Sequence, residues 1–149
     1  MDGRHSVFLV FGLLGCSSKT KPQDASATNE EKTEKYTSMR SELPTNMNGI
    51  RTMQQAYMQE YDVYVPCSPY PEKPSQQPQT WENSASGSFQ TIQFSPKEDV
   101  RGSYMVSTTG TGFDFTVIGI SDVDGDGVYA TYMATKSIPP TLQTAPDIY

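Results

Sequence analysis

Residues 39–61 read MRSELPTNMNGIRTMQQAYMQEY and carry the most regular apolar pattern in the chain. Large apolar side chains recur there every three or four residues, which is the repeat of a helix with one buried face. Pro44 interrupts the repeat, so the helix either has Pro44 in its first turn or is kinked there. We expect it to be regular from residue 45 to about residue 61. The apolar face consists of Met39, Leu43, Met47, Ile50, Met53, Tyr57 and Tyr61.

Four later segments alternate with a period of two residues and indicate the sheet that this helix would cover. Their short connections are typical of hairpins, and hence of an antiparallel meander. The methionine-rich helix face suits either an adaptable groove for a partner or packing on the protein's own sheet, and we expect the second. The sequence therefore predicts an α+β domain over residues 38–149, with one N-terminal amphipathic helix packed on a four-stranded antiparallel sheet. The predicted strands are residues 89–94, 103–108, 113–120 and 128–134.

A proline-rich segment separates the predicted helix from the predicted sheet. Residues 64–80 contain five prolines, and we expect a long irregular surface loop there rather than a polyproline ligand, with Trp81 anchoring its end. Cys67 lies in this loop, and no histidine is available to activate its thiol. We therefore expect a partly buried, unreactive thiol.

The N-terminal residues have the pattern of a processing signal. Residues 7–15 read VFLVFGLLG, an apolar run of nine that ends at Cys16. A helix of that length rises only about 14 Å, which is too short to span a bilayer but suits the apolar region of a secretory signal. Residues 13–16, LLGC, resemble a bacterial lipoprotein lipobox. The alternative is a short buried strand that ends in cysteine.

The lipobox resemblance implies that residues 1–15 are a removed lipoprotein signal peptide and that Cys16 carries the lipid. Residues 16–37 would then be the lipidated cysteine and a flexible tether, because they contain almost no large apolar side chain. The protein would be lipid-anchored in a bacterial cell envelope, facing the periplasm or the surface. Ser17 is compatible with sorting to the outer membrane.

The composition excludes several classes of function. The chain has 149 residues and a net charge of −6, which argues against a nucleic-acid partner because such proteins present a basic face. From residue 42 onward there are five basic and twelve acidic residues, so the acidity belongs to the folded head. The single histidine, His5, falls in the predicted signal. We therefore expect neither a histidine-activated nucleophile nor an imidazole zinc site, and we expect a protein that is not an enzyme.

An acidic turn is the sharpest candidate site. Asp122, Asp124 and Asp126 occupy alternate positions in ISDVDGDGVY, residues 120–129. Carboxylates with this spacing can converge on Ca²⁺, which takes six to eight oxygen ligands. The segment is not an EF-hand, because Met133 stands where the bidentate glutamate would be, so a site would need backbone carbonyls, water or a distant acid such as Asp114. The alternatives are a plain Asp-Gly hairpin turn and, least favoured, a catalytic carboxylate pair, which would need a cleft.

The order of these features resembles a known group of proteins. Residues 46–64, NMNGIRTMQQAYMQEYDVY, are similar to the end of the long helix in type IV pilins and type II secretion pseudopilins. The segments FSP at 94–96 and YMV at 104–106 resemble the sheet of pilin-like proteins. Residues 113–129, which include the acidic turn, also resemble that sheet, and the final PDIY at 146–149 is similar to the ends of these proteins. The resemblance covers residues 39–149 and implies a pilin-like head fold. It also implies calcium at Asp122, Asp124 and Asp126, because pseudopilins often bind calcium in a C-terminal acidic loop.

One departure from that family affects the expected function. Pilins begin with an apolar helix of more than twenty residues that packs the filament core, whereas here a lipid on a tether takes its place. We therefore expect the head fold but not polymerisation in the usual way. The expected function is that of a non-enzymatic, membrane-anchored accessory or structural component of a type IV pilus or type II secretion system. The alternative is an independent cell-envelope binding module, dependent on calcium or engaged in adhesion.

Overall fold

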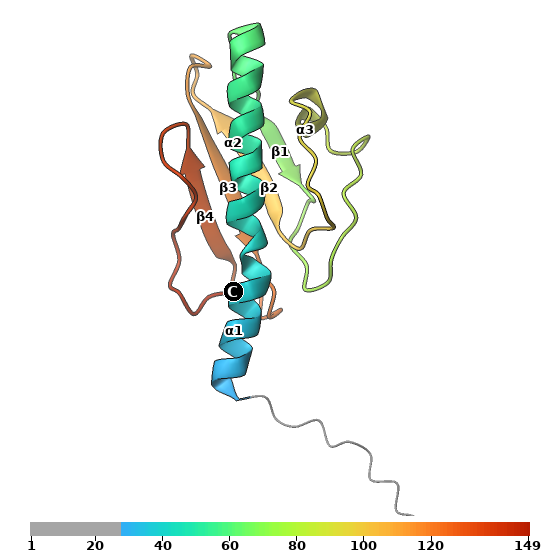
Figure 1. Ribbon diagram of the computed structural model, residues 1–149, viewed down its shortest axis with the longest axis vertical. Helices are drawn as coiled ribbons and strands as arrows, with labels where there is room; N and C mark the ends of the chain where they lie inside the picture. The colour runs from blue at the N-terminus through green and yellow to red at the C-terminus, as the bar shows by residue number, and fades with distance from the viewer. Residues whose placement is uncertain (1–27) are drawn as a thin grey trace, which may run out of the picture.

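The computed structural model describes residues 28–149 and has the predicted α+β architecture (Figure 1). The sheet is a fully antiparallel meander with strands in chain order, β1-β2-β3-β4-β5. The predicted signal peptide, Cys16 and residues 16–27 lie outside the described residues. The helices are α1 (Asn29–Arg40), α2 (Glu42–Tyr61) and α3 (Ser88–Thr91), and the strands are β1 (Cys67–Tyr70), β2 (Ser103–Thr108), β3 (Phe115–Ser121), β4 (Ala130–Thr135) and β5 (Thr141–Leu142).

Helix α2 lies across one face of the sheet, as its apolar repeat predicts (Figure 1). Leu43, Met47 and Ile50 are completely buried in the core, and each contributes about 2 kcal/mol of hydrophobic stabilisation. Gly119 on β3 makes this close packing possible, because a Cβ atom there would lie 2.8 Å from the Met47 sulfur. Tyr61, the last position of the predicted face, is instead 54% exposed because α2 extends past the sheet.

Pro44 is accommodated in the first turn of α2, so the first of the two predicted alternatives is close to the structure. The helix begins at Glu42, two residues before the proline. Proline is tolerated there because the first amide groups of a helix have no carbonyl partner within it. The irregularity falls at Ser41, which separates α1 from α2.

The prediction of a flexible tether through residue 37 is wrong for its last part, because residues 29–40 form α1. A capping box begins this helix: the Thr28 amide donates to the Glu31 carboxylate at 2.8 Å, and the Glu31 amide donates to the Thr28 hydroxyl at 3.3 Å. The final residues of the chain hold its other end, since the Tyr36 and Tyr149 rings lie 5.5 Å apart. Composition alone does not reveal this distant contact.

The predicted strands match the sheet unevenly. The strand at 103–108 is confirmed as β2, and those at 113–120 and 128–134 correspond to β3 and β4 with shifted ends. The strand at 89–94 is wrong, because residues 88–91 form the short helix α3. A turn of helix directs Phe89, Ile92 and Phe94 into the same core, which an extended strand with alternating faces could not do.

Two short edge strands were not predicted, so the sheet has five strands rather than four. Strand β1 lies inside the proline-rich segment and pairs Cys67 with Val106. Strand β5 has only two residues. Proline is compatible with β1 because an edge strand leaves one row of amide groups without ladder partners.

The anchoring role of Trp81 is confirmed, and Cys67, predicted to be partly buried, is almost completely buried. The Trp81 ring meets Tyr70, Phe89 and Phe94 edge-on at centroid distances of 4.8, 5.4 and 5.6 Å. Cys67 is free and only 2% exposed, and burial raises the pKa of its thiol to about 12. The thiol therefore stays protonated and inaccessible at neutral pH.

Candidate functional site

The acidic turn connects β3 to β4. The Ser121–Ala130 pair is the last pair of the β3–β4 ladder, and residues 122–129 connect the two strands beyond it. Gly125 and Gly127 have φ angles of 76° and 82°, a backbone conformation that glycine adopts without strain. The Asp-Gly pairs therefore supply positive φ angles within a connection of residues 122–129, which is longer than a two-residue hairpin turn.

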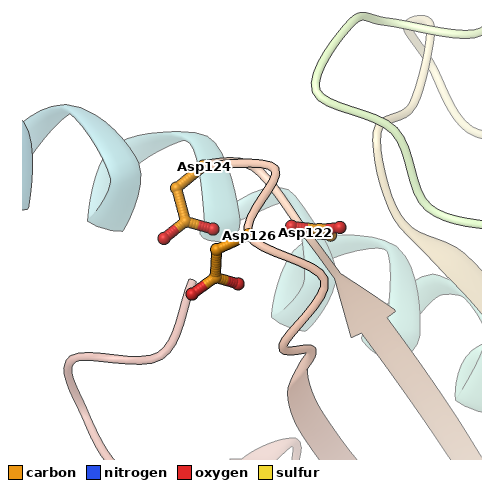
Figure 2. A group of neighbouring side chains, drawn as sticks. All are labelled: Asp122, Asp124 and Asp126. Atoms are coloured by element: carbon orange, nitrogen blue, oxygen red, sulfur yellow. The ribbon is translucent and has the colours of Figure 1, made fainter.

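The turn brings the three predicted aspartates together. Asp122, Asp124 and Asp126 each offer a carboxylate oxygen within 4.8 Å of the others. Figure 2 shows the Asp124 and Asp126 side chains extending toward the same side of the loop, with Asp122 beside them. Calcium–oxygen bonds measure 2.3–2.6 Å, so three oxygens with this separation can contact one cation.

The electrostatics of the turn are those of crowded carboxylates. The pKa of Asp124 is raised, first by partial burial and then by the charge of Asp126, with a smaller contribution from Asp122. One carboxylate oxygen of Asp124, Oδ1, is buried and has no hydrogen-bond partner among the described residues. A bound cation would reduce both the repulsion and the cost of desolvation.

Hydrogen bonds within the loop also fit the alternative of a plain turn. The Val128 amide donates to the Asp126 carboxylate at 2.7 Å, and the Gly127 amide donates to that of Asp122 at 3.5 Å. Contacts of this kind stabilise Asx turns in the absence of a metal. The three carboxylates alone also fall short of the six to eight oxygens that Ca²⁺ prefers.

Asp114 does not complete the set, although its acidity made it a candidate ligand. It precedes β3, whereas the acidic turn follows that strand, so the seven residues of β3 separate the two places by about 20 Å. The Asp114 carboxylate instead accepts the Phe115 amide at 2.8 Å. The spacing of acidic residues in the chain could not reveal that they lie at opposite ends of one strand.

Gln76 is a contact of the acidic turn that the sequence reasoning missed. Its side-chain amide donates to the backbone carbonyl of Asp124 at 2.6 Å and so ties the proline-rich segment to the turn. The two residues are 48 positions apart in the chain, and no single motif contains both of them. No local sequence signal predicts this contact.

A cavity of about 590 Å³ lies elsewhere, between the α1–α2 junction and residues 94–101. The carboxylate of Glu42 lines it but already accepts hydrogen bonds from the Arg101 and Gly102 amides, both at 2.7 Å, and from the Tyr104 hydroxyl at 3.0 Å. Glu42 therefore joins α2 to β2. None of the three turn aspartates lines this cavity.

Comparisons with known proteins provide no family assignment. No family model, curated protein or solved structure matches this chain. The helices formed by residues 28–149 do not combine the length and the apolarity that a membrane crossing requires.

Proposed function

We propose that this chain is a non-enzymatic, lipid-anchored, pilin-like protein of the bacterial cell envelope. It would serve as an accessory or structural subunit of a type IV pilus or a type II secretion system. The observation that carries the proposal is the arrangement of α2, a 20-residue helix laid over an antiparallel meander. The sequence of that helix also bears the resemblance to pilins, so the pattern and the architecture support the same reading.

The position of α1 supports a role as a spacer between the membrane and the head. Figure 1 shows α1 leading into α2 and projecting past the end of the sheet. A helix of 12 residues is about 18 Å long, and it begins 13 residues after Cys16. A lipid at Cys16 would therefore hold the head close to a membrane with a helical strut between them.

The end of α1 is braced by the C-terminal segment. Arg40 is only 5% exposed, and its guanidinium donates to the backbone carbonyls of Pro146, at 3.2 Å, and Ile148. It also lies 5.1 Å from the centre of the Tyr149 ring, within range of a cation–π contact. This bracing supports a strut that keeps its direction relative to the head.

The anchor and the partners are tested separately. Cells fed radioactive palmitate should label the wild-type chain and the Cys67→Ala variant but not Cys16→Ala. Equal labelling of Cys16→Ala would contradict the anchor. Crosslinking in intact cells, followed by purification of the chain, should recover pilin or secretion subunits. Their absence after efficient crosslinking would contradict membership of such a machine.

A second candidate function is a calcium-dependent cell-envelope binding module that acts outside any filament. The observation that favours it is the convergence of the three aspartates within 4.8 Å. In this case Ca²⁺ would hold the β3–β4 turn in a shape that recognises an extracellular ligand. The chain would then purify alone after crosslinking, which distinguishes it from a filament subunit. It would also gain stability from Ca²⁺, but this gain alone does not separate the two functions, because the pilin resemblance implies calcium as well.

A further inference from the structure

The face of the sheet opposite α2 carries a continuous apolar row. Strand register pairs Met105 on β2 with Ile118 on β3, and Ile118 with Met133 on β4. Directly paired residues point to the same side of a sheet, and their neighbours Tyr104 and Val117 are buried in the core beneath α2. The three side chains therefore lie side by side on the outer face.

This row stands outside the core cluster beneath α2 and is partly open to solvent. Met133 is 38% exposed, Met105, Ile118 and Ile120 are partly exposed, and none of the four belongs to the core cluster or packs against it. Within residues 28–149, α2 packs on β3 and β4, and α3 packs on the edge strand β1. Figure 1 shows α2 lying over a single face of the sheet.

The outer face is also free of charge. Apart from the four apolar residues, the outward positions of β2, β3 and β4 carry only serine or threonine, and one of these, Ser103 at the start of β2, is only 2% exposed. This contrasts with a chain in which 19% of residues are charged and the net charge is −6. Burying such a face would desolvate no ionised group, which is the compositional signal of an interface core.

We propose that the outer face is a self-association surface, where a second copy of this chain packs face to face. Two copies are both acidic and repel each other at most approaches, and the outer face lets them meet without placing carboxylates opposite one another. A partner of opposite charge would favour a surface rich in carboxylates, whereas this surface has none. Sheets packed face to face lie about 10 Å apart, a distance that methionine and isoleucine side chains can fill.

Charge also selects the orientation of the two copies. In an isologous pair the same patch is used twice, and the two-fold axis lies between the sheets. An axis along β3 would bring the two acidic turns to the same end of the dimer. An axis along the Met105–Ile118–Met133 row places them at opposite ends and sets each residue of the row against its own counterpart. The two copies therefore adopt this second, row-on-row arrangement.

Site-directed crosslinking tests the arrangement on the full chain with Cys16→Ala, so that no lipid drives association. Cys67 is buried and protonated and does not compete. A Met105→Cys variant should form a covalent dimer with a short bis-maleimide reagent. Gln59→Cys, on the exposed side of α2, should not. Crosslinking only in a mixture of Met105→Cys and Met133→Cys chains would overturn the row-on-row arrangement, and the same experiment in cells would overturn self-association if it captured a different protein instead.

Sedimentation equilibrium tests the association itself. Met133→Glu places two carboxylates against each other in the dimer and should raise its dissociation constant by at least about tenfold. The matched variant Gln59→Glu adds the same charge away from the face and should leave the dissociation constant unchanged. Circular dichroism melts establish that both variants are folded. A parent chain that stays monomeric at about 100 µM, or a dimer that tolerates Met133→Glu, would overturn the proposal.

Discussion

Replacing Asp124 by asparagine should stabilise the calcium-free protein and should weaken its stabilisation by calcium. The three carboxylates converge within 4.8 Å, and two unit charges at that distance in water repel by about 0.9 kcal/mol. Asp124 has two such neighbours, and screening at physiological salt leaves about 1 kcal/mol. Roughly half of this repulsion persists in the unfolded chain, because the aspartates are close in sequence. Asp124→Asn should therefore stabilise the calcium-free protein by about 0.5 kcal/mol.

The assay is thermal unfolding followed by circular dichroism, in chelator and in 5 mM Ca²⁺. In chelator, Asp124→Asn should raise the Tm by about 2 °C for a domain of this size. A site with a Kd of about 1 mM, typical of extracellular modules, would stabilise the wild-type chain by about 1 kcal/mol at about 5 mM Ca²⁺. The wild-type Tm should then rise by about 4 °C, whereas the variant should gain less than about 1 °C.

Asp114→Asn is the matched control, because it removes one negative charge at the opposite end of β3. Its amide oxygen can still accept the Phe115 amide, so it should behave like the wild type in both conditions. A wild-type Tm that does not change between chelator and Ca²⁺ would refute the cation site. An Asp124→Asn variant that is less stable than the wild type in chelator would refute the repulsion argument and favour a carboxylate needed by the turn.

Acidification tests independently whether the ionised Asp124 carboxylate destabilises the folded protein. The pKa of Asp124 is raised in the folded state, so the folded protein takes up this proton more readily than the unfolded chain. The ionised carboxylate is therefore destabilising at neutral pH, and that penalty disappears as the pH falls through the folded-state pKa. In chelator, the stability difference between Asp124→Asn and the wild type should shrink on acidification. A difference that grows would contradict the raised pKa.

Three further predictions concern the core, the thiol and the α1 brace. Ile50→Ala should lower the free energy of unfolding by 2–5 kcal/mol in urea titrations, whereas the exposed Gln59→Ala should change it by less than about 0.5 kcal/mol. The Cys67 thiol should resist iodoacetamide at pH 8 in the folded protein and react in denaturant, and rapid labelling of the native chain would contradict its burial. Arg40→Met should lower the free energy of unfolding by about 1–3 kcal/mol and should speed hydrogen exchange in residues 146–149 by at least about tenfold. Unchanged exchange would show that other contacts hold this segment.

The parts of the fold that the sequence predicted are those governed by local repeats. The apolar stripe through Leu43, Met47 and Ile50 specified α2 and its buried face, because a helix repeats every 3.6 residues whatever it packs against. The alternation in residues 103–108 likewise specified β2. At the candidate site, the Asp-Gly pairs predicted the positive φ angles of Gly125 and Gly127, since φ is a property of the local backbone.

Sequence alone thus determined a helix followed by an antiparallel meander, and the acidic connection within it. The tertiary structure decided what depends on distant contacts. Residues 29–37 are helical where their polar composition predicted a tether, with Tyr36 against Tyr149 at the far end of the chain. The shared core around Trp81 bends residues 88–91 into a helix, and Asp114 is kept apart from the acidic turn by the length of β3. Periodicity indicates the conformation of a segment, but only packing brings segments together. The acidic turn and the outer face of the sheet both depend on which side chains this packing leaves exposed.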